Sequence, residues 1–193
     1  EGNVSMSFLP LSHVYERMWV AYVFHKGVIN CYLDDTNRVA EALKEVKPHY
    51  MCVVPRLLEK IYTKIYENVG KQSLAKRIVF AAATRIAKIQ LGRTKKGKYP
   101  SFVLKKLYNV ADKLVFQKLK AALGGNIQMI PCGGALLEPS IGRFFRAIGV
   151  NVTLGYGMTE TTATVSCWDD KKFKLKSVGT LVPHIQAKIG ENN

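Results

Sequence analysis

The chain has 193 residues, of which 48% are hydrophobic, and its formal net charge is +15 at pH 7. A chain of this length and composition can bury a substantial core, which argues against disorder and predicts one domain or one large lobe. The longest apolar run, Met18 to Phe24, is far shorter than the roughly 20 residues that cross a bilayer, so we expect no membrane-spanning segment.

Apolar runs alternate with helical patterns in the first third of the chain. The runs lie at residues 4–11, 28–33 and 49–55. Between them, the pattern predicts one helix from an N-cap at Ser12 to about Lys26 and a second helix over 36–47. This alternation is typical of parallel β-α-β units, whose buried strands are continuous apolar runs. We therefore expect, over about 1–55, the start of an α/β fold with a doubly wound, mostly parallel sheet flanked by helices.

The middle of the chain, residues 56–124, is expected to be a basic helical insertion. Pro55 suits the first turn of a helix, and helical patterns continue to about Leu123. Between Lys71 and Lys120 the sequence has 14 Lys and Arg residues and one acid, Asp112, which gives this segment a net charge of +13. The remainder of the chain has a net charge of only +2.

A stripe of apolar residues runs along this segment with lysines beside it, formed by Val103, Leu107, Val110 and Leu114. One interpretation is a solvated helical hairpin that docks on the rest of the domain through the stripe. The alternative is attraction of 71–120 to anionic lipid or to an anionic substrate. Nucleic acid is not expected as a partner, because no helix-turn-helix, RNP or zinc-finger pattern accompanies the basic residues.

The last third, residues 125–193, repeats the β-α-β pattern. The sequence predicts a strand over 126–130, a helix over 138–149, a strand over 150–154, and further strands over 162–168 and 182–190. The four cysteines form no Cys-x-x-Cys pair and have no histidine at metal-ligand spacing. We therefore expect neither a zinc site nor a disulfide scaffold, and a reducing, cytoplasmic compartment.

Two glycine-rich stretches follow predicted strands, PCGGALLEPS after Ile130 and LGYGMTET after Leu154. Glycines at the end of a parallel strand let backbone N–H groups approach a ligand, and α/β sheets bind nucleotides at that edge. Taken alone, the first stretch favours a tight turn into a helix that begins near Glu138 and Pro139.

The second stretch has side chains suited to a nucleotide with its metal. Tyr156 offers a flat face for a purine ring, and Thr159 offers a hydroxyl for a phosphate oxygen. Glu160 is a hard oxygen ligand for Mg²⁺. The alternative is a hairpin turn with a solvated glutamate.

Three motifs occur in order along the chain: SFLPLSHVYER near the start, then GGALLEP, then GYGMTETT. With these motifs the chain resembles the AMP-forming acyl-CoA synthetases, most closely the long-chain fatty acid–CoA ligases, over nearly its whole length. The resemblance implies the central part of the N-terminal AMP-binding domain of such an enzyme. It also implies a two-step reaction, in which a fatty acid carboxylate attacks the α-phosphate of ATP and coenzyme A then displaces AMP from the acyl-adenylate.

The resemblance implies roles for individual residues. The implied nucleotide-binding set is Gly133, Gly134, Ala135, Gly155, Tyr156, Gly157, Met158 and Thr159. The first three lie against the adenine, and Tyr156 stacks on or flanks that ring. Thr159 hydrogen-bonds the α-phosphate, Glu160 holds Mg²⁺, and His13 lies near the acyl carboxylate and the thiol entry path. These last three are the catalytic candidates, although a structural histidine next to Ser12 is the alternative for His13.

The resemblance further implies parts that we expect outside these 193 residues. A Ser/Thr/Gly-rich phosphate loop with its lysine is expected before Glu1. An aspartate for the ribose, a hinge and a small C-terminal domain with a catalytic lysine are expected after Asn193. We therefore expect the isolated chain to be inactive. Two alternatives stay open: a ligase for another carboxylic acid of the same superfamily, and a basic non-enzymatic module that binds anionic membrane or nucleic acid. Peripheral contact at the inner membrane face through 71–120 also stays open.

Overall fold

The computed structural model describes residues 2–95, 97, 99–169 and 173–190 of the chain. Its strands, in chain order, are β1 (Val4–Ser7), β2 (Ile29–Tyr32), β3 (Tyr50–Met51), β4 (Ile130–Cys132), β5 (Val152–Met158), β6 (Ala163–Cys167) and β7 (Thr180–Leu181). The first three pair in parallel in the order β2-β1-β3. A second sheet has the order β4-β5-β6-β7, in which β4 and β5 are parallel and the last three strands are antiparallel.

Two isolated parallel bridges join the two sheets. Tyr50 pairs with Met129, and Val53 pairs with Cys132, so β3 lies beside β4. The strands from β1 to β5 are therefore parallel to their neighbours, and of the strands that the structure describes only β6 runs in the opposite direction. The predicted α/β class with a mostly parallel sheet is confirmed.

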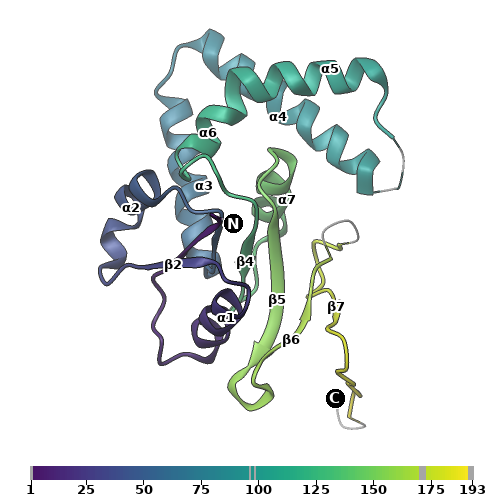
Figure 1. Cartoon of the computed structure of the whole chain (residues 1–193). Coiled ribbons are helices and arrows are strands. Elements are labelled where there is room, and N and C mark those ends of the chain that lie inside the picture. Colours follow the sequence, from purple (N-terminus) through teal and green to yellow (C-terminus); the bar gives the residue numbers. More distant parts are fainter. Residues whose placement is uncertain (1, 96, 98, 170–172, 191–193) are drawn as a thin grey trace.

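Helices flank this layer of strands, as Figure 1 shows. They are α1 (Val14–His25), η1 (Thr36–Arg38), α2 (Val39–Val46), α3 (Pro55–Gly70), α4 (Leu74–Lys95), α5 (Phe102–Ala111), the π-helical turn η2 (Asp112–Phe116), α6 (Gln117–Ala121), α7 (Pro139–Ala147) and the short η3 (Thr159–Thr161). Pro55 occupies the first turn of α3, as expected. None of the described helices is both long enough and apolar enough to cross a membrane.

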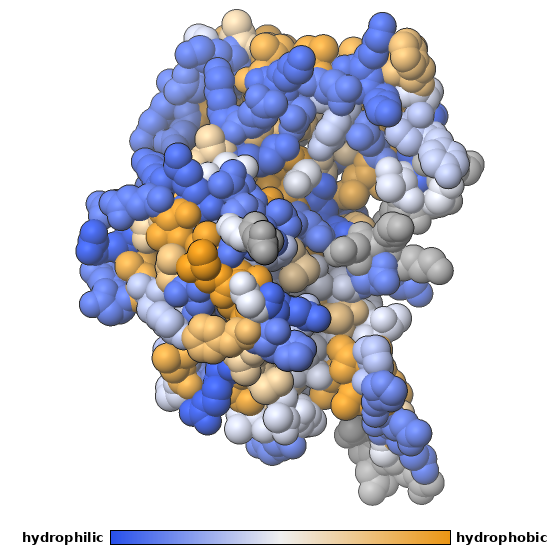
Figure 2. Space-filling view, viewed as in Figure 1, coloured by the Kyte–Doolittle hydropathy of each residue, from blue (hydrophilic) through white to orange (hydrophobic). Residues whose placement is uncertain are grey.

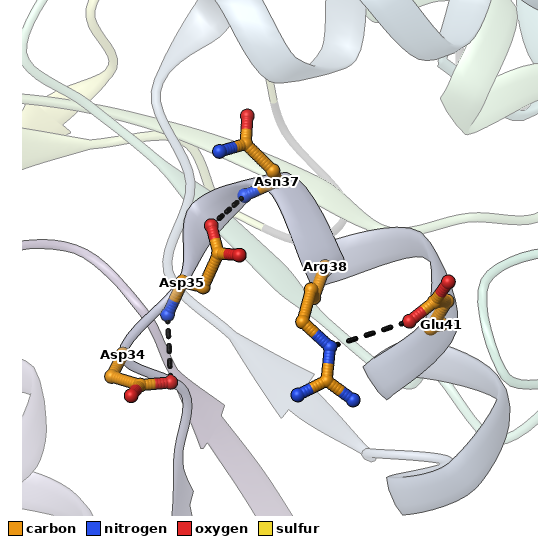
Figure 3. A network of polar contacts seen from close by, with 5 residues as sticks. All are labelled: Asp34, Asp35, Asn37, Arg38 and Glu41. Carbon is orange, nitrogen blue, oxygen red and sulfur yellow. Dashed lines mark hydrogen bonds and ion pairs between the residues drawn. The ribbon is translucent and has the colours of Figure 1, made fainter.

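Local hydrogen bonds begin the helical turn that leads into α2 (Figure 3). The Asp35 carboxylate accepts a hydrogen bond of 2.9 Å from the Asn37 N–H, which satisfies one of the free donors at the start of η1. Arg38 and Glu41 then form an exposed ion pair of 3.3 Å, three residues apart along the helix. These contacts fix the helical segment that the apolar spacing over 36–47 predicted.

Several element boundaries differ from the sequence prediction. Helix α1 begins at Val14 with His13 at the N-cap position, so the predicted Ser12 cap is wrong. The strand predicted over 126–130 is shifted, because β4 starts only at Ile130. No strand covers 182–190, and the final pairing is made by the two-residue β7 instead. Apolar character alone did not locate these ends, because hydrogen-bonding partners from distant segments define a strand.

The core lies between the sheet and the helices, and its largest buried side chains include Trp168, Phe116, Phe144 and Phe145. Phe116 comes from η2, so the hairpin of α4 and α5 with η2 is anchored in the same core as the sheet. Tyr108 of α5 adds a 3.1 Å hydrogen bond from its hydroxyl to the carbonyl of Ala147.

The hairpin does not dock through the predicted apolar stripe. Val103, Leu107, Val110 and Leu114 are exposed by 65%, 47%, 54% and 58%. The packed side of the helices holds Tyr108, Ala111 and Phe116 instead. The segment is apolar on two faces, so spacing along one face could not show which face packs. In Figure 2, hydrophobic residues lie among strongly hydrophilic ones over the upper end of the molecule, where Figure 1 places α5.

Truncation of the two faces should therefore have unequal effects on stability. Phe116→Ala removes a fully buried side chain and should lower the free energy of unfolding by about 3–5 kcal/mol. Leu114→Ala, two residues away on the exposed face, should change it by less than about 0.5 kcal/mol. Urea unfolding of both variants measures this difference, and equal losses would show that the stripe packs after all.

Candidate functional site

A pocket of about 330 Å³ lies where three distant segments of the chain meet. Its walls come from the start of α1, from the loop after β4, and from the hairpin of β5 and β6. Among the predicted site residues, those that line it are His13, Gly133, Gly134, Gly155, Tyr156, Gly157, Met158 and Thr159. Ala135 and Glu160 do not line the pocket. The volume is within the range of small-molecule binding sites.

The loop after β4 packs closely over Tyr15. The Gly133 N–H donates a hydrogen bond of 3.2 Å to the carbonyl of Val53, which continues the pairing of β3 with β4. A Cβ atom at Gly133 would lie 3.2 Å from the nearest ring carbon of Tyr15, a tight contact. The loop then leads into α7, which begins at Pro139 as predicted, and the Glu138 carboxylate caps its N-terminus. The loop that turns from β4 into α7 therefore also forms part of the pocket wall.

The second glycine-rich stretch continues the strand that the sequence predicted to end at Leu154, and it forms one arm of a hairpin with an exposed Glu160, as in the alternative interpretation. Strand β5 continues through it to Met158, pairs with β6, and changes register between Tyr156 and Gly157. A Cβ atom at Gly157 would lie 1.5 Å from the carbonyl oxygen of Ala163, which no side chain could tolerate. Glycine is therefore needed here for the close approach of two strands. Tyr156, 47% exposed, projects from this strand at the pocket.

The tight turn of the hairpin follows at η3, and Thr161 holds it together. Its hydroxyl oxygen accepts a hydrogen bond of 3.1 Å from the Met158 N–H. Thr162 and Ala163 then have positive φ angles of 55° and 84°. The turn places Thr159 at the pocket and leaves Glu160 exposed beside it. Sequence reasoning missed Thr161, although a hydroxyl three residues after Met158 is the signal of a local side-chain to backbone bond.

Sequence reasoning also missed Glu16, which lines the pocket from α1 and is only 1% exposed. Neither of its carboxylate oxygens has a hydrogen-bond partner among the described residues. Burial raises the pKa of Glu16 to about 7. The nearby Ser7 hydroxyl donates its hydrogen bond to the Asn30 side-chain oxygen at 3.2 Å and not to Glu16. The only sequence signal was its place three residues after His13, on the same side of a helix.

Tyr15 lies next to Glu16 and shares its environment. Its hydroxyl is buried and has no hydrogen-bond partner among the described residues. Burial, with a smaller contribution from the neighbouring Cys52, raises the pKa of the Tyr15 hydroxyl far above its usual value. Tyr15 is therefore a neutral wall of the pocket and not an ionised group.

The described residues include no group of three or more His, Cys, Asp or Glu side chains that could hold a metal ion. Glu160 is an exposed carboxylate that makes no ion pair with any described residue. Magnesium typically takes one or two carboxylates together with substrate phosphates. The described side chains therefore fit an ion that arrives with a nucleotide.

The sequence profile of the AMP-binding enzyme family matches residues 1–193. The chain belongs to this family. Long chain acyl-CoA synthetase 5 of Arabidopsis thaliana is 35% identical over 192 residues, and the match covers 98% of this chain and 28% of the relative. The long-chain-fatty-acid–CoA ligase FadD15 of Mycobacterium bovis is 32% identical, with 100% and 32% covered. The chain thus spans about a third or less of the length of these relatives.

Solved structures of the same fold include o-succinylbenzoate CoA synthetases. The enzyme from Bacillus subtilis in complex with ATP and magnesium ion has a TM-score of 0.58 and 14% identity, over 98% of this chain and 29% of that one. An Escherichia coli enzyme with a bound ligand has a TM-score of 0.58 and 17% identity, over 99% and 29%. These similarities establish the fold of the chain as that of the corresponding part of these synthetases.

The two glycines of the hairpin should respond differently to an added methyl group. Gly157→Ala should lower the free energy of unfolding by roughly 2–3 kcal/mol, because the strands must separate around the new Cβ. Gly155→Ala is the matched control, since its Cβ would lie no closer than 3.4 Å to a neighbouring atom. Urea unfolding measures both, and equal stabilities would contradict the close approach at Gly157.

The raised pKa of Glu16 predicts a pH dependence of stability. The pKa of Glu16 is about 7 in the folded protein and 4.5 in the unfolded chain. At pH values between these two pKa values, folding is therefore accompanied by uptake of a proton. The stabilising contribution of protonated Glu16 is complete below about pH 4.5 and is lost as the pH rises through about 7. Between about pH 5 and about pH 8, the wild type should lose roughly 2–3 kcal/mol relative to Glu16→Gln. Urea unfolding at both pH values tests this, and parallel pH profiles would contradict it.

Proposed function

We propose that the protein acts as an AMP-forming long-chain fatty acid–CoA ligase. In the first step a carboxylate oxygen attacks the α-phosphorus of ATP, and the bond to the departing pyrophosphate breaks. In the second step the thiol of coenzyme A attacks the acyl carbon, loses its proton, and displaces AMP to give the thioester. The observation that carries the proposal is the pocket that brings His13, the Gly133–Gly134 loop and the Tyr156–Thr159 strand end together in a chain of the AMP-binding enzyme family.

The glycine loop and Tyr156 are suited to the adenine. Gly133 and Gly134 present backbone without side chains at the pocket, so a flat ring can approach closely. Tyr156 also lines the pocket and supplies an aromatic face that is about half exposed. Gly157, the next residue, lets β5 and β6 approach each other closely beside Tyr156.

Thr159 and Glu160 are suited to the reacting phosphate. The first step brings two anions together, and positioned donors and cations lower its barrier by neutralising the developing charge. Thr159 lines the pocket, and its hydroxyl can donate a hydrogen bond to an α-phosphate oxygen there. Glu160 would hold the Mg²⁺ ion, which when bound with ATP supplies positive charge to the phosphates. Thr161 positions both residues by holding the turn.

His13 is suited to a role at the acyl group. It lies at the N-cap of α1 and lines the pocket, and its side chain makes no capping hydrogen bond to the helix. The helix therefore does not depend on the imidazole, which favours a ligand contact over a purely structural role. The fatty acid as substrate rests on the similarity to relatives that are long-chain ligases of a plant and of a mycobacterium.

The experiment is pyrophosphate release by the full-length protein with Mg-ATP and a series of carboxylates from acetate to palmitate. We expect release to increase with acyl length. Glu160→Ala should reduce the rate by about 10²–10³, the usual cost of removing one group that stabilises a transition state. Glu41→Ala is the control, since Glu41 is an exposed carboxylate on α2 outside the pocket. Unchanged release in Glu160→Ala would refute its role, and release only with a different class of acid would replace the fatty acid in the proposal.

A further inference from the structure

Glu16 is a buried carboxyl group in the wall of the pocket, and the proposed reaction does not use it. It lies on α1, three residues after His13, and is only 1% exposed. Neither of its carboxylate oxygens has a hydrogen-bond partner among the described residues. A buried polar group without a partner costs free energy, so its presence in a pocket wall indicates a role there.

The described residues already enclose Glu16. Helix α1 packs against β1, β2 and β6. The Ser7 hydroxyl of β1 donates its hydrogen bond to Asn30 of β2, and the Trp19 indole of α1 donates at 3.0 Å to the Ser5 hydroxyl. These contacts hold α1 on the strands. The burial of Glu16 therefore comes from packing within this chain and does not depend on a further segment that covers α1.

The surroundings of Glu16 supply little compensating charge. Its neighbour Arg17 is exposed and donates to the carbonyl of Leu11 at 3.2 Å. The other described titratable groups on the pocket end of α1, on the strands packed against it and in the adjoining strand ends are His13, Tyr15, Cys31, Tyr32, Tyr50, Cys52, Cys132 and Cys167. Of these, only His13 can be positively charged. Burial, and not a neighbouring charge, therefore raises the pKa of Glu16 to about 7.

The ligand proposed for this pocket is an anion. The phosphate of an adenylate is proposed to bind near Thr159, which lines the same cavity of about 330 Å³ as Glu16. Two negative charges in one partly buried site disfavour each other, so a bound phosphate favours the neutral form of the carboxyl. By thermodynamic linkage, ionisation of the carboxyl weakens binding of the phosphate by the same factor.

We propose that Glu16 makes adenylate binding depend on a proton: the pocket binds an adenylate tightly when Glu16 is neutral, and ionisation of Glu16 weakens that binding. The effect is electrostatic and acts across the pocket, so it requires no hydrogen bond between Glu16 and the ligand. Glu16 thereby sets which charge the pocket accepts. The inference rests on the proposed function, which supplies the anion.

A cation held by Glu16 is the competing explanation for its unpaired oxygens. A metal ion needs several ligands, and the described pocket wall offers no second carboxylate beside Glu16. A bound cation would keep Glu16 ionised across the neutral pH range. The two explanations therefore predict different pH dependences.

The test is isothermal titration calorimetry of the full-length protein with octanoylsulfamoyl adenosine. This stable mimic of an acyl-adenylate keeps a single negative charge throughout the neutral pH range. Ionisation of Glu16 should lower its affinity by about tenfold between about pH 5.5 and about pH 9, as expected for two charges roughly 10 Å apart in a partly buried site. Binding should also take up as much as about half a proton near pH 7.5, which is measured in buffers of different ionisation enthalpy.

Glu16→Gln and Glu16→Leu both remove the titrating group, and either one suffices if the other does not fold. The ratio of affinities at about pH 5.5 and about pH 9 should be about tenfold smaller in these variants than in the wild type. Any pH dependence that remains in them belongs to other groups such as His13. Glu41→Gln is the matched control, because Glu41 is an exposed carboxylate on α2 outside the pocket, and it should follow the wild type. Circular dichroism verifies folding.

Two results would overturn the inference and leave the proposed function intact. One is a pH dependence that is the same in the wild type and in the Glu16 variants, because it would come from another group. The other is tight binding of the mimic without pH dependence in the wild type, as a bound cation would cause. Absence of binding at every pH and in every variant would instead refute the proposed function, and this inference with it.

Discussion

The parallel pairing of β3, β4 and β5 is the constraint on which the site depends. Parallel strands end at the same edge of a sheet, so the segments that follow them meet there. The loop after β4 and the hairpin end of β5 are separated by a whole helix in the sequence, yet both line one pocket. The bridge between Val53 and Cys132 brings the first sheet to the same edge, and with it the start of α1 and His13.

Backbone approach at the hairpin is a second requirement of the same site. The carbonyl of Ala163 occupies the space that a Cβ at Gly157 would fill, so the strands can close only around glycine. Closure lets Thr161 bond the Met158 backbone and sets the turn that carries Thr159 and Glu160. The close strand pairing at Gly157 therefore helps to set the positions of Thr159 and Glu160, the side chains proposed to act on phosphate.

Burial changes the protonation equilibria of two residues in the pocket wall. Glu16 and Tyr15 lie side by side with buried polar atoms, and burial favours the neutral form of each. At neutral pH the Glu16 carboxyl is therefore divided between its two protonation states. The basic hairpin is the opposite case, because its charges are solvated and concentrated on one segment, away from the pocket turn.

The sequence by itself determined the α/β class, the helical middle, the concentration of positive charge, and the residues that carry the motifs. These follow from local periodicity, from composition and from the order of the motifs, all of which can be read along the chain. Only the tertiary structure decided that the glycine-rich stretch is a strand, that the stripe at Val103 to Leu114 faces outward, and that Glu16 is buried. Each of these depends on which distant segment lies opposite, through the Ala163 carbonyl, the core around Phe116, and the sheet beneath α1. Local patterns contain no information about such partners, because hydrogen bonding between strands and burial are set by contacts far apart in the sequence.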